Sequence, residues 1–290
     1  MAEFPPNSGD LEIVLASDLG CRCDRALDRA RALAAAWRAR LRLVIAVEDD
    51  FHDPSWRSAR HHLIEQAGAD LAAEFQDDAI DWTLDVAAGD PAEVVMAAAA
   101  QSGARLIVTG VARNELMGRN DPGRMARTLM RRAPAPVLVV KRRPHDPYRR
   151  MMAPTDFSRA SELAAAEAMR LFPDATLTLL HGYRVPFSGF ISEPANQDEM
   201  REEALENLAE FRKRLQVRAG GREPLTALVE YGSVEELEAD YVRSHAPDLV
   251  VLGAKRTGRF GGQGAADRLL LGARCDVLIV PEASQAAEAA

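Results

Sequence analysis

The chain has 290 residues, of which 47% are hydrophobic and 28% charged, and its formal net charge is −8. This length is typical of two globular domains, and the acidic balance excludes proteins that bind nucleic acid through a net basic surface. Three cysteines are too few for a disulfide framework, and no apolar run reaches the roughly 18 residues of a membrane helix.

The N-terminal ten residues, MAEFPPNSGD, lack the basic start and apolar stretch of a secretory signal. We therefore expect a cytoplasmic protein without a membrane partner. Cys21 and Cys23 lie where the first helix is expected to begin, a position that can lower a thiol pKa. Reduced thiols without a redox function are the favoured interpretation.

In the first half of the chain, apolar runs typical of buried parallel strands alternate with segments of helical periodicity. Helices are expected from about Asp24, Trp56 and Pro91, and the last of these carries Asp90 as N-cap and Glu93 in a capping-box-like position. A fourth helix follows a turn that begins at Gly110. The expected strands are residues 13–16, 41–47, 82–88, 106–109 and 137–140.

The second half repeats this pattern, so one unit of about 140 residues is written twice. Val140 corresponds to Val280, Gly110 to Gly253 and Asp18 to Asp156, with offsets of 140, 143 and 138 residues. Ser233 and Glu236 form a capping box before the third helix of this half. The expected strands are residues 151–153, 176–180, 225–230, 249–252 and 277–280.

A basic, proline-containing segment joins the two halves, and we place the domain boundary there, giving domains 1–143 and 144–290. Proline and charge favour a solvated connector over a nucleic-acid patch. The residues concerned are Lys141, Arg142, Arg143, Pro144, Pro147, Arg149 and Arg150.

Five strands separated by four helices predict a doubly wound parallel sheet in each domain, because crossover connections are right-handed. The candidate strand orders are 2-1-3-4-5 and 3-2-1-4-5, and we adopt the second. Ligands bind such sheets at the carboxyl ends of the strands, where the winding reverses. That crevice would bring Asp18 to the Gly110 turn, and Asp156 to the Gly253 turn.

Several motifs together resemble the universal stress protein family over nearly the whole chain, as a tandem pair. They are Ala16-Ser17-Asp18-Leu19 and Ala153-Pro154-Thr155-Asp156-Phe157-Ser158 after the first strands, Gly89 and Gly232 before the third helices, and the closing segments 133–140 and 274–280. The resemblance implies two Rossmann-like domains of the adenine nucleotide alpha hydrolase-like type.

ATP-binding members of that family carry Gly-x2-Gly-x9-Gly-Ser/Thr, in which glycines let backbone amides approach phosphates. Here Arg113 and Arg256 replace the second glycine, and both motifs are degraded. An arginine could pair with phosphate or fill its space. The glycine-rich loop of the second half could equally be a surface turn, and Asp18 and Asp156 could simply cap strand ends. The nucleotide-binding residues that the resemblance implies are Asp156, Gly253, Arg256 and Gly264, with Asp18, Gly110 and Gly123 in the first half.

We therefore expect a non-catalytic stress-response regulator that binds a small ligand, with ATP or another adenine nucleotide as the candidate, mainly in the second half. Magnesium would enter only with the nucleotide. The alternatives are a slow ATP hydrolase and a scaffold without ligand. The sequence has no phosphate-binding Gly-x4-Gly-Lys-Ser/Thr motif, and its histidines lack partners at metal-binding spacing.

Partner interactions are expected at the apolar fifth strands, since unpaired strand edges favour pairing. Family members dimerise through this strand, so the resemblance implies that strands 137–140 and 277–280 pair with each other within one chain. A homo-oligomer of the tandem chain is also possible.

Overall fold

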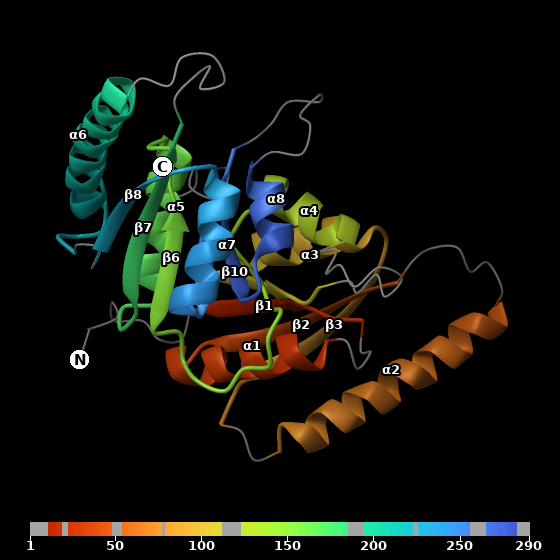
Figure 1. Ribbon diagram of the computed structural model, residues 1–290. Helices are drawn as coiled ribbons and strands as arrows, with labels where there is room; N and C mark the ends of the chain where they lie inside the picture. The colour runs from red at the N-terminus through yellow and green to blue at the C-terminus, as the bar shows by residue number, and fades with distance from the viewer. Residues whose placement is uncertain are drawn as a thin grey trace. The chain divides into compact units, whose positions relative to one another are not determined.

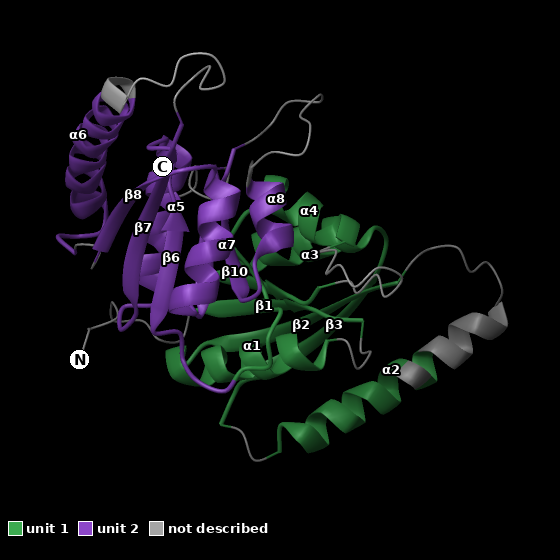
Figure 2. Cartoon of the chain, viewed as in Figure 1, with its two compact units in different colours: residues 1–144 green, residues 145–290 purple. Residues whose placement is uncertain are grey.

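A computed structural model describes residues 11–18, 23–47, 54–76, 79–111, 123–184, 194–222, 226–255 and 265–282 (Figure 1). The chain divides into two compact units, residues 1–144 and 145–290 (Figure 2). Each unit alternates strands and helices along the chain. No helix in these described ranges is both long and apolar enough to cross a membrane.

Unit 1 is a parallel sheet with helical crossovers. Its strands follow the order β3-β2-β1-β4-β5, and each pairing is parallel. The order 3-2-1-4-5 predicted from the sequence is thereby confirmed for this unit. Its elements are β1 (Glu12–Ala16), α1 (Asp24–Trp37), β2 (Arg40–Val47), α2 (Pro54–Glu74), β3 (Trp82–Ala88), α3 (Pro91–Ser102), β4 (Leu106–Thr109), α4 (Gly123–Arg132) and β5 (Val137–Val139).

Unit 2 has the same topology, with the strand order β8-β7-β6-β9-β10 and parallel pairing throughout. The prediction is confirmed here too, whereas the expected pairing of the two fifth strands with each other stays a prediction. The elements are β6 (Arg150–Pro154), α5 (Arg159–Leu171), β7 (Thr176–Tyr183), α6 (Pro194–Arg218), β8 (Thr226–Tyr231), α7 (Val234–His245), β9 (Leu249–Ala254), α8 (Ala265–Gly272) and β10 (Asp276–Pro281).

The central strands of both units are buried along most of their length, as parallel strands covered on two faces must be. Helices supply this cover, and α5 is buried along nearly all of its residues. In α6 four residues at helical spacing are buried: Ala204, Leu208, Phe211 and Leu215.

The helix starts differ between the two units in how their caps are built. The predicted capping box of α7 is confirmed, because Ser233 and Glu236 each bond the other's backbone amide. At α3, Asp90 accepts hydrogen bonds from the amides of Ala92 and Glu93. The Glu93 side chain instead pairs with Arg132 of α4, so the capping-box-like arrangement expected there is only half formed.

Candidate functional site

In unit 2 the carboxyl ends of β6 and β9 lie side by side, because the two strands pair in parallel from Met151 opposite Leu249. This is the point at which the winding direction reverses, and where doubly wound sheets bind ligands. The Lys255 ammonium, directly after β9, donates to Oδ2 of Asp156, after β6, at 2.9 Å. The strand order therefore brings Asp156 to the segment that follows Gly253, as expected.

The Asp156 carboxylate makes one contact within its own turn and one solvent-exposed contact with Lys255. Its Oδ1 accepts a hydrogen bond from the Ser158 amide at 3.1 Å, which closes a turn, while Oδ2 faces Lys255. Burial would raise the pKa of this carboxyl, but hydrogen bonds from Ser158 and Lys255 outweigh it and lower the pKa to about 2. The two side chains remain 61% and 56% exposed, so an ionised pair lies open to solvent.

The turn that carries Asp156 is held by its neighbours. The Thr155 hydroxyl accepts from the Phe157 amide at 3.0 Å and lies 3.0 Å from the Ser161 hydroxyl. Phe157 has a φ of 59°, a conformation uncommon for an aromatic residue, and its ring stacks on His181 at 4.1 Å between centroids. The turn is thus fixed by several contacts that do not involve the Asp156 carboxylate.

His181, near the end of β7, contacts this turn through its ring and through Nδ1. Its Nδ1 lies 2.7 Å from the Thr155 carbonyl oxygen, so Nδ1 carries the proton and donates it. Among the described residues no group of three or more His, Cys, Asp and Glu side chains is placed to hold a metal ion. The histidine therefore has a positioning contact with backbone.

Gly253 is required by packing. A Cβ at this position would lie 2.3 Å from the Ala160 carbonyl oxygen and 2.5 Å from the Ala160 carbonyl carbon, both in the backbone of α5. The helix crosses β9 so closely at this point that only glycine fits. From the sequence, this glycine is interpreted as allowing a phosphate to approach the backbone. The structure shows that close packing against α5 also requires glycine here. Arg256 and Gly264, also predicted to bind nucleotide, lie outside the described residues.

The corresponding region of unit 1 has different chemistry. The Cys23 thiol donates to Oδ1 of Asp18 at 3.0 Å, which ties this carboxylate into the turn between β1 and α1. Gly110 follows β4 and Gly123 begins α4 with a φ of 78°, while the loop between them is outside the described ranges. Ala112 occupies the position that corresponds to Lys255 at the offset of 143 residues.

Cys23, at the start of α1, has a thiol pKa set mainly by burial. Burial, with hydrogen bonding to and repulsion from the Asp18 carboxylate, raises the pKa of its thiol to about 11, although the Asp18 amide acts against this. The lowering of the thiol pKa that a helix N-terminus can produce is therefore not found at Cys23. Desolvation outweighs the helix N-terminus, and the sulfur stays protonated at neutral pH.

Lys255 is the residue that sequence reasoning missed. It stands outside the glycine pattern that drew attention to this loop, and its charge gave no signal among the 36 lysine and arginine residues of the chain. A usable signal existed in its position, because it directly follows the fourth strand at the point where the winding reverses. A cation there faces the residue that follows the first strand.

These features define the class of protein. Each unit is a doubly wound α/β domain, and unit 2 has its charged pair at the switch point where such domains bind small ligands. The sequence model of the universal stress protein family matches twice, over residues 12–141 and 147–281. The chain belongs to the universal stress protein family.

Solved structures support the fold over nearly the whole chain. A functionally unknown protein of Pseudomonas aeruginosa PAO1 shares 17% identity over 97% of this chain and 96% of its own, with a TM-score of 0.67. A universal stress protein of Archaeoglobus fulgidus DSM 4304 shares 13% identity over 93% and 98%, with a TM-score of 0.66. No curated protein matches the chain.

Replacing Gly253 with Ala should destabilise unit 2, because the added methyl overlaps the α5 backbone. We expect a loss of about 1–3 kcal/mol in the free energy of unfolding, measured by urea denaturation. Gly272→Ala is the matched control, since its nearest heavy atom is 3.9 Å away. A Gly253→Ala chain as stable as the control would contradict the packing role.

The Asp156 carboxyl should titrate near pH 2 in the folded chain, and Lys255→Met should raise this pKa toward its ordinary value. Because the folded pKa lies below the unfolded value of about 3.9, the stabilisation is complete above about pH 5 and is lost as the pH falls through the folded pKa near 2. Carboxyl carbon NMR measures the titration directly. An unchanged pKa in the variant would show that Lys255 does not pair with Asp156 in solution.

The Cys23 thiol should react slowly with iodoacetamide at neutral pH, since little thiolate is present. In a Cys21→Ser chain we expect alkylation at pH 7.5 on the order of 100-fold slower than for an unperturbed thiol, with the rate still rising above pH 9. Asp18→Asn, which removes the repelling charge, should accelerate it. A rate that levels off near pH 7 would disprove the raised pKa.

Proposed function

We propose that the chain is a non-catalytic, cytoplasmic stress-response protein whose second unit binds a small anionic ligand, an adenine nucleotide. The observation that carries this proposal is the exposed Asp156–Lys255 pair at the switch point of unit 2. The pair offers an acceptor and a cation at the edge where doubly wound sheets receive nucleotides.

The chemistry of the pair fits the two ends of a nucleotide. An ionised Asp156 accepts hydrogen bonds, and would take them from a ribose hydroxyl or an adenine amine. The Lys255 ammonium would attract phosphate oxygens, since lysine acts as a compact point charge toward phosphate. Magnesium, if it takes part, would arrive bound to the phosphates.

Ligand binding would have to separate the two side chains, and the cost of doing so is small. An ion pair between exposed side chains contributes about 0–1 kcal/mol, because water screens it and both side chains lose freedom. The turn around Asp156 would persist, since Thr155, Phe157 and His181 hold it independently. The site is therefore ordered in advance yet easily opened.

Unit 1 is the weaker candidate for the same ligand. Its Asp18 carboxylate accepts from the Cys23 thiol, and Ala112 replaces the lysine. From these positions unit 1 presents an exposed carboxylate with one oxygen bonded to a thiol, and alanine in place of the cation. We infer that the two units have diverged, with ligand binding retained in the second.

Titration calorimetry of the full chain with ATP tests this proposal. Asp156→Ala should weaken binding by about 1–2 kcal/mol, roughly tenfold, because a charged hydrogen-bond acceptor is lost. Lys255→Ala should weaken ATP more than adenosine, which lacks the phosphates. Asp18→Ala is the matched control and should change the affinity less than twofold. Equal effects of the two aspartate variants would refute the assignment to unit 2.

Two further measurements separate the alternatives. Mass spectrometry of ligand released from natively purified protein should detect an adenine nucleotide, whereas an empty protein that also fails to bind added ATP would be a scaffold. Turnover of labelled ATP should stay at the background rate. A rate that depends on Asp156 would identify the slow hydrolase instead.

A further inference from the structure

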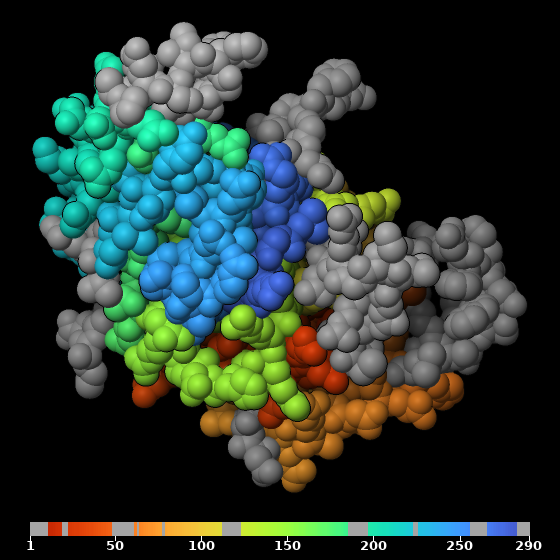
Figure 3. All heavy atoms as spheres, viewed as in Figure 1, coloured from red at the N-terminus to blue at the C-terminus, as the bar shows by residue number. Residues whose placement is uncertain are grey.

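A second charged site lies in unit 2, at the seam between α5 and α6. Four residues line an open hollow of about 390 Å³ there, a size within the range of small-molecule sites. Three of them, Arg214, Val217 and Arg218, come from the last turns of α6, and Glu162 comes from the first turns of α5. In Figure 3 α6, coloured teal, forms an outer surface of this unit.

A buried carboxylate organises the hollow. The Glu162 side chain is only 6% exposed, and each of its oxygens accepts from the Nε of one arginine, Arg214 at 3.0 Å and Arg218 at 2.7 Å. Burial would raise its pKa, but the two guanidinium groups outweigh this and lower it. Glu162 is therefore ionised, and its one negative charge faces two positive charges.

The two arginines use only part of their hydrogen-bonding capacity in this cluster. A guanidinium has five N–H donors, and here the Nε donor of each goes to Glu162. Nη2 of Arg214 also donates to the Phe157 carbonyl at 3.3 Å. Within the part of the chain that the structure describes, Nη1 of Arg214 and both terminal nitrogens of Arg218 have no hydrogen-bond acceptor.

These donors are accessible, since the side chains of Arg214 and Arg218 are 47% and 36% exposed. Glu162 fixes their positions, so they need little reorganisation to bind a ligand. If the ion pair served only to join α5 to α6, one arginine would be enough to balance the charge of Glu162. The second arginine leaves a net positive charge beside the hollow.

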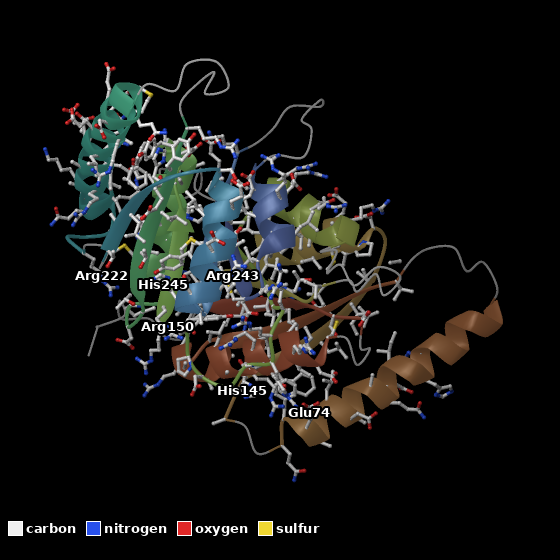
Figure 4. All side chains as sticks on the ribbon, viewed as in Figure 1. Glu74, His145, Arg150, Arg222, Arg243 and His245 are labelled. Atoms are coloured by element: carbon white, nitrogen blue, oxygen red, sulfur yellow. The ribbon has the colours of Figure 1, made fainter. Side chains whose placement is uncertain are left out.

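Arg222 adds positive charge to the surroundings, and Val217 adds an apolar contact. Arg222, which follows α6 (Figure 4), donates to the Met169 and Pro173 carbonyls. Arg170 donates to the Arg218 carbonyl at 3.1 Å, and its charge is paired with Glu167. Val217 borders the hollow and is 83% exposed. An anionic group at the arginines would therefore have an aliphatic side chain beside its organic portion.

We propose that the hollow at Glu162, Arg214, Val217 and Arg218 binds a phosphate monoester. Guanidinium groups match the oxygens of a phosphate in paired hydrogen bonds, and two guanidinium groups suit a doubly charged oxyanion. Val217 contacts the esterified organic group. The source is either a small phosphorylated metabolite or a phosphorylated side chain of a protein, which present the same chemistry to the site.

Binding of phenyl phosphate to the full chain, followed by titration calorimetry, tests this site. Arg218→Gln should weaken binding at least about tenfold, because a charged donor pair is removed. Val217→Asp should weaken it similarly by repulsion, and should leave the melting temperature unchanged because the residue is exposed. Arg243→Gln on α7 is the matched charge control, since Arg243 is exposed and pairs with Asp240 of its own helix, and it should change affinity less than twofold (Figure 4).

Two comparisons complete the experiment. Asp156→Ala should retain phenyl phosphate binding, which distinguishes this hollow from the strand-end site. Tighter binding of a phosphoserine peptide than of phenyl phosphate would assign the site to a protein partner, and the reverse order to a metabolite. Absence of binding at about 1 mM phenyl phosphate, or binding that Val217→Asp and Arg218→Gln leave intact, would overturn the proposal.

Discussion

The close crossing of α5 over β9 is the constraint on which the second unit depends. It exists because Gly253 has no side chain, so that the helix backbone can approach the strand. The strand β9 in turn pairs with β6, and this parallel pairing places the ends of both strands at one edge. Asp156 and Lys255 meet there although 98 residues separate them along the chain (positions 157 to 254).

The two units show how one topology can carry different chemistry. Both have the strand order 3-2-1-4-5 and an aspartate after the first strand. In unit 1 the aspartate bonds a thiol within its own turn, and in unit 2 it faces a lysine from the fourth strand. The half-buried thiol of raised pKa in unit 1 and the exposed ion pair in unit 2 are chemically different groups. The two units therefore differ in these few residues, while the strand order of the sheet remains the same.

Much of the fold could be predicted from the sequence, because buried parallel strands and amphipathic helices leave strong periodic signals. Because the unit occurs twice, each predicted element could also be checked against its counterpart in the other half. The Asp156 turn was found through its motif, but Lys255 was not, since an ion pair between distant residues leaves no periodicity. The Cys23 pKa was missed for a related reason: burial depends on tertiary packing, and it outweighed the helix terminus that the sequence did reveal.

The arginine cluster at Glu162 could not be predicted from the sequence either, because it too depends on tertiary packing. Its carboxylate lies on α5 and its guanidinium groups on α6, some fifty residues later, so only the packed structure shows that they share one hollow. Arginines on the exposed side of a helix are common, and they are usually solvated. The buried glutamate distinguishes this pair by fixing it in place.

The central claim is that the second unit holds the nucleotide, and a backbone amide NMR titration of the full chain with ATP tests it most directly. The account predicts that shifts concentrate at the ends of β6 and β9, around Asp156 and Lys255, while the turn at Asp18 stays unperturbed. Shifts of equal size in both units, or confined to the first, would contradict it.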